Sequence, residues 1–237
     1  MAVVRATAQQ ITRLASFSTC ELADAIVKLT PPSNRVPTGG YVPALERFSG
    51  KEGETLVGEA FTVEMVAGTD TAAPKLSGHF VDLAEPESIV FVSTPEWVKS
   101  ASLGGLLATA LQVKGVKGFV TSGRVRDLAE LRDLDFPVFA RGHSILGQSP
   151  FTRVSRVQIP LKIHPPGDRF GDVWPVTEIH PYDLVVADTD GVFVVRPEMV
   201  EQVMDLAEKG REVDEKCRRD LLAGKGVQET FKLHRGK

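Results

Sequence analysis

The sequence predicts a single α/β domain with a parallel βαβαβ centre, and three observations lead to that fold class. The first is size, since 237 residues with 42% hydrophobic and 25% charged side chains can bury one substantial core. The second is a regular alternation of strand and helix patterns between residues 88 and 142. The third is that no internal repeat, low-complexity tract or linker divides the chain. We therefore expect one domain over residues 1–237, ending in a mobile helical tail from about residue 197.

The first predicted helix runs from Thr19 to Leu29. Ser18 and Glu21 have the spacing of a capping box, and apolar residues follow at helical intervals. Two prolines end the pattern, and the Pro- and Gly-rich stretch 31–40 predicts an irregular loop. A strand is then expected from Leu56 to Met65.

The centre of the chain contains three apolar strand patterns separated by two helical ones. The strands are expected at 89–92, 118–120 and 137–140, and the helices at 103–113 and 128–134. This order is that of two βαβ units, which require parallel strands and right-handed crossovers. The strands are continuously apolar, as strands buried on both faces should be.

The remaining patterns predict antiparallel strands and a terminal helix. Strands are expected at 157–163, 183–187 and 191–195, and the Asp190-Gly191 pair between the last two is a strong hairpin signal. An amphipathic helix with many charges should follow from about Pro197 to Leu222.

Composition argues against several classes of function. The net charge is −3 and the basic residues are scattered among acidic ones, so we expect no nucleic-acid partner. Cys20 and Cys217 stand at opposite ends of the sequence and form no disulfide framework. No apolar run approaches the roughly 20 residues of a membrane span, and residues 1–12 lack the core of a signal peptide. We therefore expect a cytoplasmic protein with no membrane partner.

The first candidate site lies after the strand at 89–92, where Gly104 and Gly105 open a helix that continues with Leu106 and Leu107. Ligands of open α/β sheets bind beyond the carboxyl ends of the strands. The first amides of a helix have no intrahelical acceptor, and glycine lets a carboxylate or phosphate approach them. The alternative is that the two glycines merely form a tight turn.

The second candidate site is Arg126-Asp127, after the strand at 118–120. Asp127 also suits a helix N-cap, and Arg126 a surface charge. The two candidate segments follow neighbouring parallel strands, so they should face one crevice. There Arg126 would bind a carboxylate and Asp127 a hard cation.

Motifs across nearly the whole chain carry a resemblance to a known family. They are Asp24-Ala25, Gly104 to Ala110, Gly115 to Gly118, Gly123 to Leu131, Phe136 to Gly142, Asp183 to Asp188 and Asp190 to Val192. With these residues the sequence resembles the RraA-like family, which includes class II 4-hydroxy-4-methyl-2-oxoglutarate aldolases that also decarboxylate oxaloacetate.

The resemblance implies a fold of the swivelling β/β/α type and a homotrimer or homohexamer with active sites between subunits. It also implies a carbon–carbon lyase that releases pyruvate from a small 2-oxo acid with Mg²⁺ or Mn²⁺. In this sequence Gly104, Gly105, Leu106 and Leu107 would hold the substrate carboxylate. Arg126 would bind the keto acid, Asp127 the metal, and Asp24 could reach a neighbouring subunit's site.

The sequence departs from the family pattern at two positions. Many aldolase members have Asp or Glu where this chain has Gly105, and Asp or Asn where it has Ser122. The general base is therefore left unassigned, together with the physiological keto acid, the metal used and the choice between trimer and hexamer. The five histidines show no zinc-ligand spacing, and Lys75 and Lys99 are the candidates for a Schiff-base mechanism.

The principal alternative function is that of a non-catalytic RraA-like regulatory protein that binds a ribonuclease. The retained Arg126-Asp127 pair favours an enzyme, and the loss of the acid at Gly105 favours the regulator. A methyltransferase is a third possibility, although the sequence has no glycine-rich cofactor loop with a downstream acidic residue.

Overall fold

The long strand β3 (Leu56–Ala67) organises the main sheet of the protein. In the computed structural model, residues 4–30, 38–167 and 174–236 are described. The strand order is β1-β12-β11-β3-β4-β6-β7-β2, with β5 paired to β6 and β8 to β3. The strand predicted at 56–65 is thus confirmed and extends two residues further. Most of the loop predicted at 31–40 lies outside the described residues.

The predicted parallel centre is confirmed. Strands β4 (Ser88–Ser93), β6 (Gly118–Val125) and β7 (Val138–His143) are parallel neighbours. Helices α4 (Gly105–Val113) and α5 (Leu128–Asp133) connect them, as two βαβ units require.

Two boundaries in this centre differ from those predicted. The first helix begins at Gly105 instead of Leu103, because residues 101–103 form a short strand, β5 (Ala101–Leu103), beside β6. Strand β6 continues five residues beyond Val120, to Val125. Most of the segment interpreted as a loop before Arg126 is therefore strand, and this fixes the direction of the chain as it enters the site.

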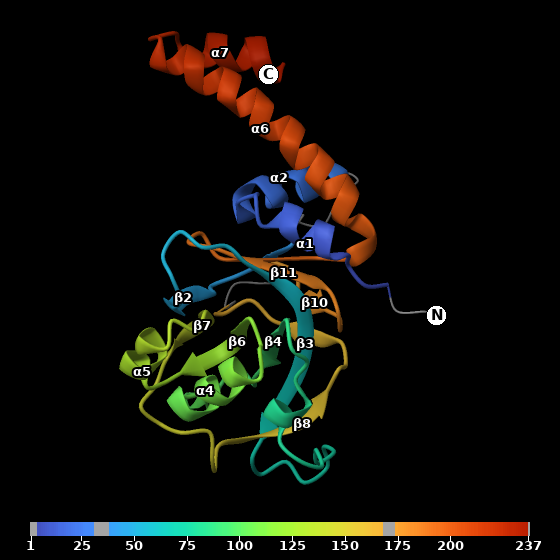
Figure 1. Cartoon of the computed structure of the whole chain (residues 1–237), viewed down its shortest axis with the longest axis vertical. Helices are drawn as coiled ribbons and strands as arrows, with labels where there is room; N and C mark the ends of the chain where they lie inside the picture. The colour runs from blue at the N-terminus through green and yellow to red at the C-terminus, as the bar shows by residue number, and fades with distance from the viewer. Residues whose placement is uncertain (1–3, 31–37, 168–173, 237) are drawn as a thin grey trace.

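Alternate residues of the parallel strands enter two different cores. Val90, Phe119 and Val138 pack with Leu111 beneath α4 and α5, which cover one face of the sheet (Figure 1). Their neighbours, including Phe91 and Phe139, pack on the other face against a two-stranded ribbon of β9 (Leu161–Ile163) and β10 (Thr177–Ile179). Burial on both faces explains the continuously apolar strand sequences.

The prediction of one strand over 157–163 was wrong. The chain instead forms β8 (Thr152–Val157), which pairs with β3, and then β9 in the separate ribbon. Between them Gln158 has a left-handed φ of 53°, and it exchanges hydrogen bonds with Thr62: its amide donates to the Thr62 carbonyl, and its Oε1 accepts from the Thr62 amide. This turn moves the chain out of the main sheet.

The antiparallel and helical predictions near the termini hold. Strands β11 (Leu184–Ala187) and β12 (Val192–Val195) form the predicted hairpin, and α2 (Thr19–Leu29) begins with the predicted capping box. Helix α6 (Val200–Leu222) follows a 3₁₀ turn at Pro197–Met199. The smaller elements are α1 (Ala8–Leu14), β1 (Tyr41–Val42), β2 (Glu46–Ser49), α3 (Phe80–Leu83) and α7 (Val227–Arg235).

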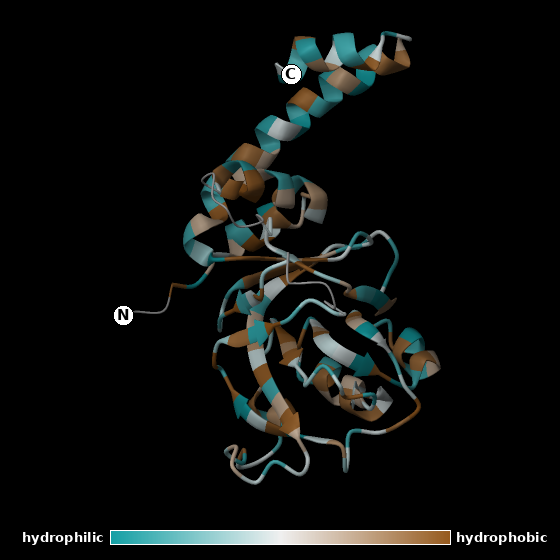
Figure 2. Cartoon of the chain, turned by 180° about the vertical axis from the view of Figure 1, so that it is seen from behind, coloured by the Kyte–Doolittle hydropathy of each residue, from teal (hydrophilic) through white to brown (hydrophobic). Residues whose placement is uncertain are grey.

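Helix α6 crosses α1 and α2 and then extends away from the sheet, where α7 folds back along it (Figure 1). Its first two turns bury Val200, Val203 and Met204, and Figure 2 shows hydrophobic residues gathered at this crossing. Among the residues that the structure describes, none of the helices combines the length and the hydropathy that a bilayer crossing would require.

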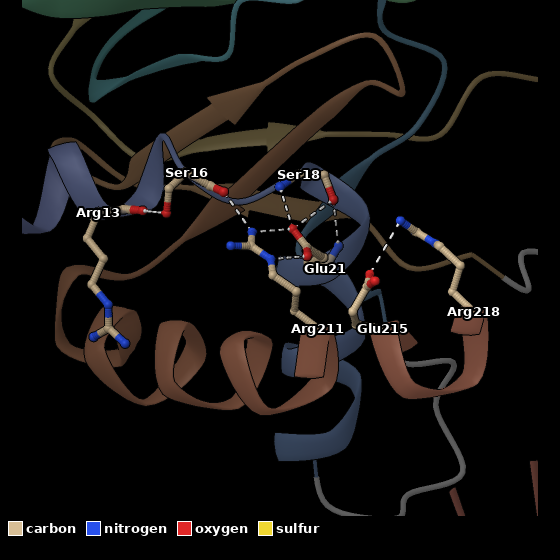
Figure 3. Close-up of polar contacts among 7 residues, drawn as sticks. All are labelled: Arg13, Ser16, Ser18, Glu21, Arg211, Glu215 and Arg218. Carbon is tan, nitrogen blue, oxygen red and sulfur yellow. Dashed lines mark hydrogen bonds and ion pairs between the residues drawn. The ribbon is translucent and has the colours of Figure 1, made fainter. Parts of the chain in front are cut away.

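A polar network joins the crossing helices (Figure 3). Arg211 on α6 donates from Nε and Nη2 to the two carboxylate oxygens of Glu21, at 2.6 and 2.8 Å, and from Nη2 to the Ser16 carbonyl. Glu21 is the capping-box residue of α2, and the Arg211 guanidinium holds the pKa of its carboxyl below the usual range. The same side chain therefore caps α2 and attaches α6 to it.

Candidate active site

The structure brings the two predicted site segments together at the end of β6. Arg126 follows the last residue of that strand, and its amide donates to the carbonyl of Leu103 at 3.0 Å. Leu103 ends β5, and Gly104 is the next residue. The short strand β5 thus places the glycine pair beside Arg126 and Asp127.

Asp127 contacts the start of α4 directly. The amide of Gly105 donates to Asp127 Oδ2 at 3.1 Å, and Arg126 Nε lies 3.4 Å from the same oxygen. A Cβ on Gly104 would lie 2.5 Å from this oxygen, so a side chain there would displace the carboxylate. The glycine pair therefore does more than form a tight turn, since it exposes an amide that accommodates an anion.

Asp127 stands at the N-cap position of α5, as its place in the sequence suggests, but its side chain makes no capping hydrogen bond there. Its backbone is left-handed, with φ 59° and ψ 46°, a conformation that costs a residue with a side chain on the order of 1 kcal/mol. That conformation directs the carboxylate across to α4. Such strain is more frequent at functional sites than elsewhere.

Leu106 and Leu107 occupy the next two positions of α4, where backbone amides have no acceptor one turn earlier. The Leu106 side chain is 86% exposed, so the surface around these amides is open. The amides and Arg126 together can hold a carboxylate, because both the helix N-terminus and the guanidinium favour negative charge.

Glu130 is a further candidate site residue that the sequence reasoning missed. A Cβ placed on Gly105 would overlap Glu130 Oε2 and would also lie 2.8 Å from its Cδ, so the Glu130 carboxylate occupies the space above Gly105. Glu130 stands three residues after Asp127, in the first turn of α5, so the two carboxylates are held near one another along the chain. That spacing was the available signal. Glu130 thus supplies a carboxylate close to position 105, where this sequence has glycine instead of the acidic residue of many aldolase members.

The site is open to solvent in a single protomer. The Arg126 and Asp127 side chains are 42% and 36% exposed. On one side the Arg126 guanidinium lies against Gly147, where a Cβ would come within 2.8 Å of Nη1. Ile145, in the same loop, is 92% exposed.

The donor set suits a hard divalent cation that keeps most of its water. Among the described residues, no group of three or more His, Cys, Asp or Glu side chains could enclose a metal ion. Mg²⁺ is commonly held by one or two carboxylates together with water and substrate oxygens, and Asp127 with Glu130 nearby fits that pattern. Neither Lys75 nor Lys99 suits a Schiff-base mechanism, because both are exposed to solvent and such a lysine needs a desolvated environment.

Asp24 does not belong to this constellation within one protomer. It is exposed on α2, while the site lies beside α4 and α5 at the opposite end of the sheet (Figure 1). Near Asp24 the thiol of Cys20 has a raised pKa, caused first by burial and then by Asp190, Asp188 and Asp24. Asp24 is thus part of a separate acidic group at the start of α2.

Comparisons with known proteins find similarity over most of the chain to the family that the sequence motifs resemble. Residues 19–194 match the model of the RraA-like family, described as aldolase/RraA. A protein of Halalkalibacterium halodurans, provisionally named a 4-hydroxy-4-methyl-2-oxoglutarate aldolase, is 29% identical over 69% of this chain and 70% of its own. An uncharacterized protein of Methanocaldococcus jannaschii is 27% identical over 93% of this chain and 92% of its own.

Solved structures share the fold. An uncharacterized protein from Pseudomonas syringae pv. tomato aligns with a TM-score of 0.80 and 21% identity, over 98% of this chain and 97% of that one. Streptomyces coelicolor RraAS2, described as an unusual member of the RNase ES inhibitor RraA family, aligns with a TM-score of 0.71 and 20% identity. That alignment covers 92% of this chain and 99% of the other.

Proposed function

The chain belongs to the RraA-like family, and from that membership we propose that it is a divalent-metal-dependent lyase. It would cleave a carbon–carbon bond in a small 2-oxo acid and release pyruvate, as a 4-hydroxy-4-methyl-2-oxoglutarate-type aldolase, an oxaloacetate decarboxylase, or both. The observation that carries the proposal is the convergence of Arg126, Asp127, Glu130 and the amides of α4 on one open surface.

The pyruvate half of the substrate would be held by groups that favour negative charge. In the proposed complex, the amides of Leu106 and Leu107 bind the carboxylate, and Arg126 orients it through its planar guanidinium. Asp127 would hold Mg²⁺ or Mn²⁺, which when bound supplies Lewis-acid stabilisation of the developing enolate. The two reactions share this enolate, so one site serves both.

Glu130 is the proposed proton-transfer residue, acting directly or through one water. In the aldol cleavage the substrate's 4-hydroxyl gives up its proton to this carboxylate, the C3–C4 bond breaks, and its electron pair passes to the pyruvate enolate. The enolate carbon then takes a proton to give pyruvate. The position of Glu130 over Gly105 supports this role, because the carboxylate stands next to the amides that would hold the substrate.

The direct test is an assay for pyruvate. Metal-free protein is given oxaloacetate or 4-hydroxy-4-methyl-2-oxoglutarate, with Mg²⁺ or Mn²⁺ added back. The pyruvate released is measured by coupling it to a second enzyme that reduces pyruvate. We expect metal-dependent release well above a control that contains metal and substrate alone, because oxaloacetate decarboxylates slowly with free metal. Rates equal to that control with both substrates would exclude the enzyme.

A regulatory binding protein is the second candidate, since a relative with the same fold is described as an RNase ES inhibitor family member. The exposed Leu106 and Ile145 beside the site favour a protein contact there.

We propose that a second subunit covers this surface in a homotrimer or homohexamer and brings its Asp24 towards the site. Sedimentation analysis of the protein with Leu106→Glu tests this, and the expected result is dissociation to monomers.

A further inference from the structure

A polar cavity of about 250 Å³ opens at the carboxyl ends of β4, β6 and β7, apart from the candidate active site. None of Gly105, Arg126, Asp127 and Glu130 lines it. Arg141 stands two residues after Phe139, which packs on the face opposite α4 and α5. Arg124 precedes Val125, which faces those helices, so Arg124 points to the opposite face as well.

The walls of the cavity carry three cations against one carboxylate. Lys99, Arg124 and Arg141 line it together with Glu96. Among the described residues, none of the three cations forms an ion pair. Arg124 Nη1 donates to the carbonyl of His143 at 3.0 Å, and Arg141 Nη2 donates to the carbonyl of His164. Each guanidinium therefore keeps donors that a carbonyl does not use.

Arg141 is the strongest indication of a missing ligand. Burial lowers the pKa of its guanidinium, and the nearby charge of Glu96 offsets this only in part; its Nε is buried without a hydrogen-bond partner among the described residues. A buried charge with an unpaired donor is costly unless an anion compensates it. Ser122 adds a further group, since its Oγ accepts from the Thr94 amide and its hydroxyl proton is left for a ligand.

We propose that this cavity is a second binding site, for a small dianion such as phosphate or a short dicarboxylate. Two guanidinium groups and an ammonium match the charge of a dianion, and planar guanidinium groups bind oxyanions and carboxylates with paired hydrogen bonds. The volume is below that of pockets for drug-sized ligands, which restricts the occupant to a small molecule. The site is independent of the proposed lyase reaction.

Calorimetric titration of the full-length Arg126→Ala variant tests the proposal, because that substitution removes the keto-acid site. Inorganic phosphate and succinate are titrated separately at low ionic strength. We expect one of them to bind Arg126→Ala, in which the cavity is the remaining anion site of the two proposed. Tighter binding of phosphate would identify a phosphate-type ligand, and tighter binding of succinate a dicarboxylate.

Substitutions in the cavity then locate the anion. In the Arg126→Ala background, Arg141→Gln should weaken binding at least about tenfold and Lys99→Gln about threefold, since each removes a charged hydrogen-bond donor. Lys99 is exposed, so its variant decides the question if Arg141→Gln fails to fold. Lys216→Gln on α6 makes the same charge change far from the cavity and should leave the affinity unchanged. Binding of neither anion to Arg126→Ala, or full affinity in folded cavity variants, would overturn the proposal.

Discussion

The carboxylate of Glu130 occupies the space that a side chain on Gly105 would require. The two residues are 25 positions apart in the sequence, and they meet because α4 and α5 lie side by side on one face of the sheet. An acidic residue at position 105 and Glu130 in this rotamer are mutually exclusive.

Glu130→Gln should reduce pyruvate release by roughly 10²-fold or more, because the amide keeps the shape of the side chain but cannot accept a proton. The KM should change little, since Arg126 and the α4 amides would still bind the keto acid. Steady-state kinetics at saturating Mg²⁺ separate the two parameters. Asp133→Asn, which removes the same charge from the same helix, serves as the matched control and should leave both parameters unchanged. Unchanged kcat in Glu130→Gln would remove this residue from the mechanism.

Gly105→Asp should be inactive or poorly folded by itself, because its Cβ would overlap Glu130. Combining it with Glu130→Ala removes the overlap and supplies a carboxylate in nearly the same place. We expect the double variant to be more active than either single variant, and kinetic measurement of all three tests this. If the activity losses of the two single variants simply added in the double variant, a carboxylate at position 105 would not replace the one at position 130.

Asp127→Asn should keep the fold but bind the divalent metal much more weakly. Asparagine tolerates the left-handed backbone at this position, and its oxygen can still accept from the Gly105 amide. It carries no charge, so Mn²⁺ affinity, measured by calorimetry, should fall at least about tenfold. Asp127→Ala should lose the metal as well, and thermal unfolding should also show a lower stability. Wild-type Mn²⁺ affinity in both variants would contradict the assignment of Asp127 as the metal ligand.

Asp183 should make stability depend on pH between about 4 and 6. Burial raises its pKa from 3.8 to about 6, so in this range the folded state binds more protons than the unfolded state. Its contribution to the free energy of unfolding is therefore largest below pH 4, falls as pH rises to 6, and is constant above that. The expected fall is about 3 kcal/mol. Urea unfolding of wild type and Asp183→Asn across this range should show the slope attributable to Asp183 disappearing in the variant.

Arg211→Ala should lower the free energy of unfolding by about 1 kcal/mol, because it breaks a two-point ion pair and a hydrogen bond that join α6 to α2. Arg218→Ala is the matched control. It breaks a single exposed contact of 3.6 Å with Glu215 on the same helix, and it should cost less than about 0.5 kcal/mol (Figure 3). If urea unfolding showed the same loss of unfolding free energy in both variants, Arg211 would contribute no more to stability than an ordinary surface charge.

The sequence by itself determined the parallel centre of the fold and the Asp190-Gly191 hairpin. Both depend on local signals: apolar runs of strand length, apolar residues at helical spacing, and a dipeptide that favours one type of turn. The order of strands and helices then allowed few topologies, because crossovers between parallel strands are right-handed. The meeting of Gly105 with Asp127 could be predicted for the same reason, since both follow neighbouring parallel strands.

Tertiary structure alone decided the detailed geometry of the candidate site. Strand β5 exists because it pairs with β6, and Asp127 turns away from its own helix because the Gly105 amide lies within reach. Glu130 lies over Gly105 because two helices pack side by side. These contacts join segments more than 20 residues apart, and their geometry depends on packing and backbone conformation, which periodicity along the chain does not encode.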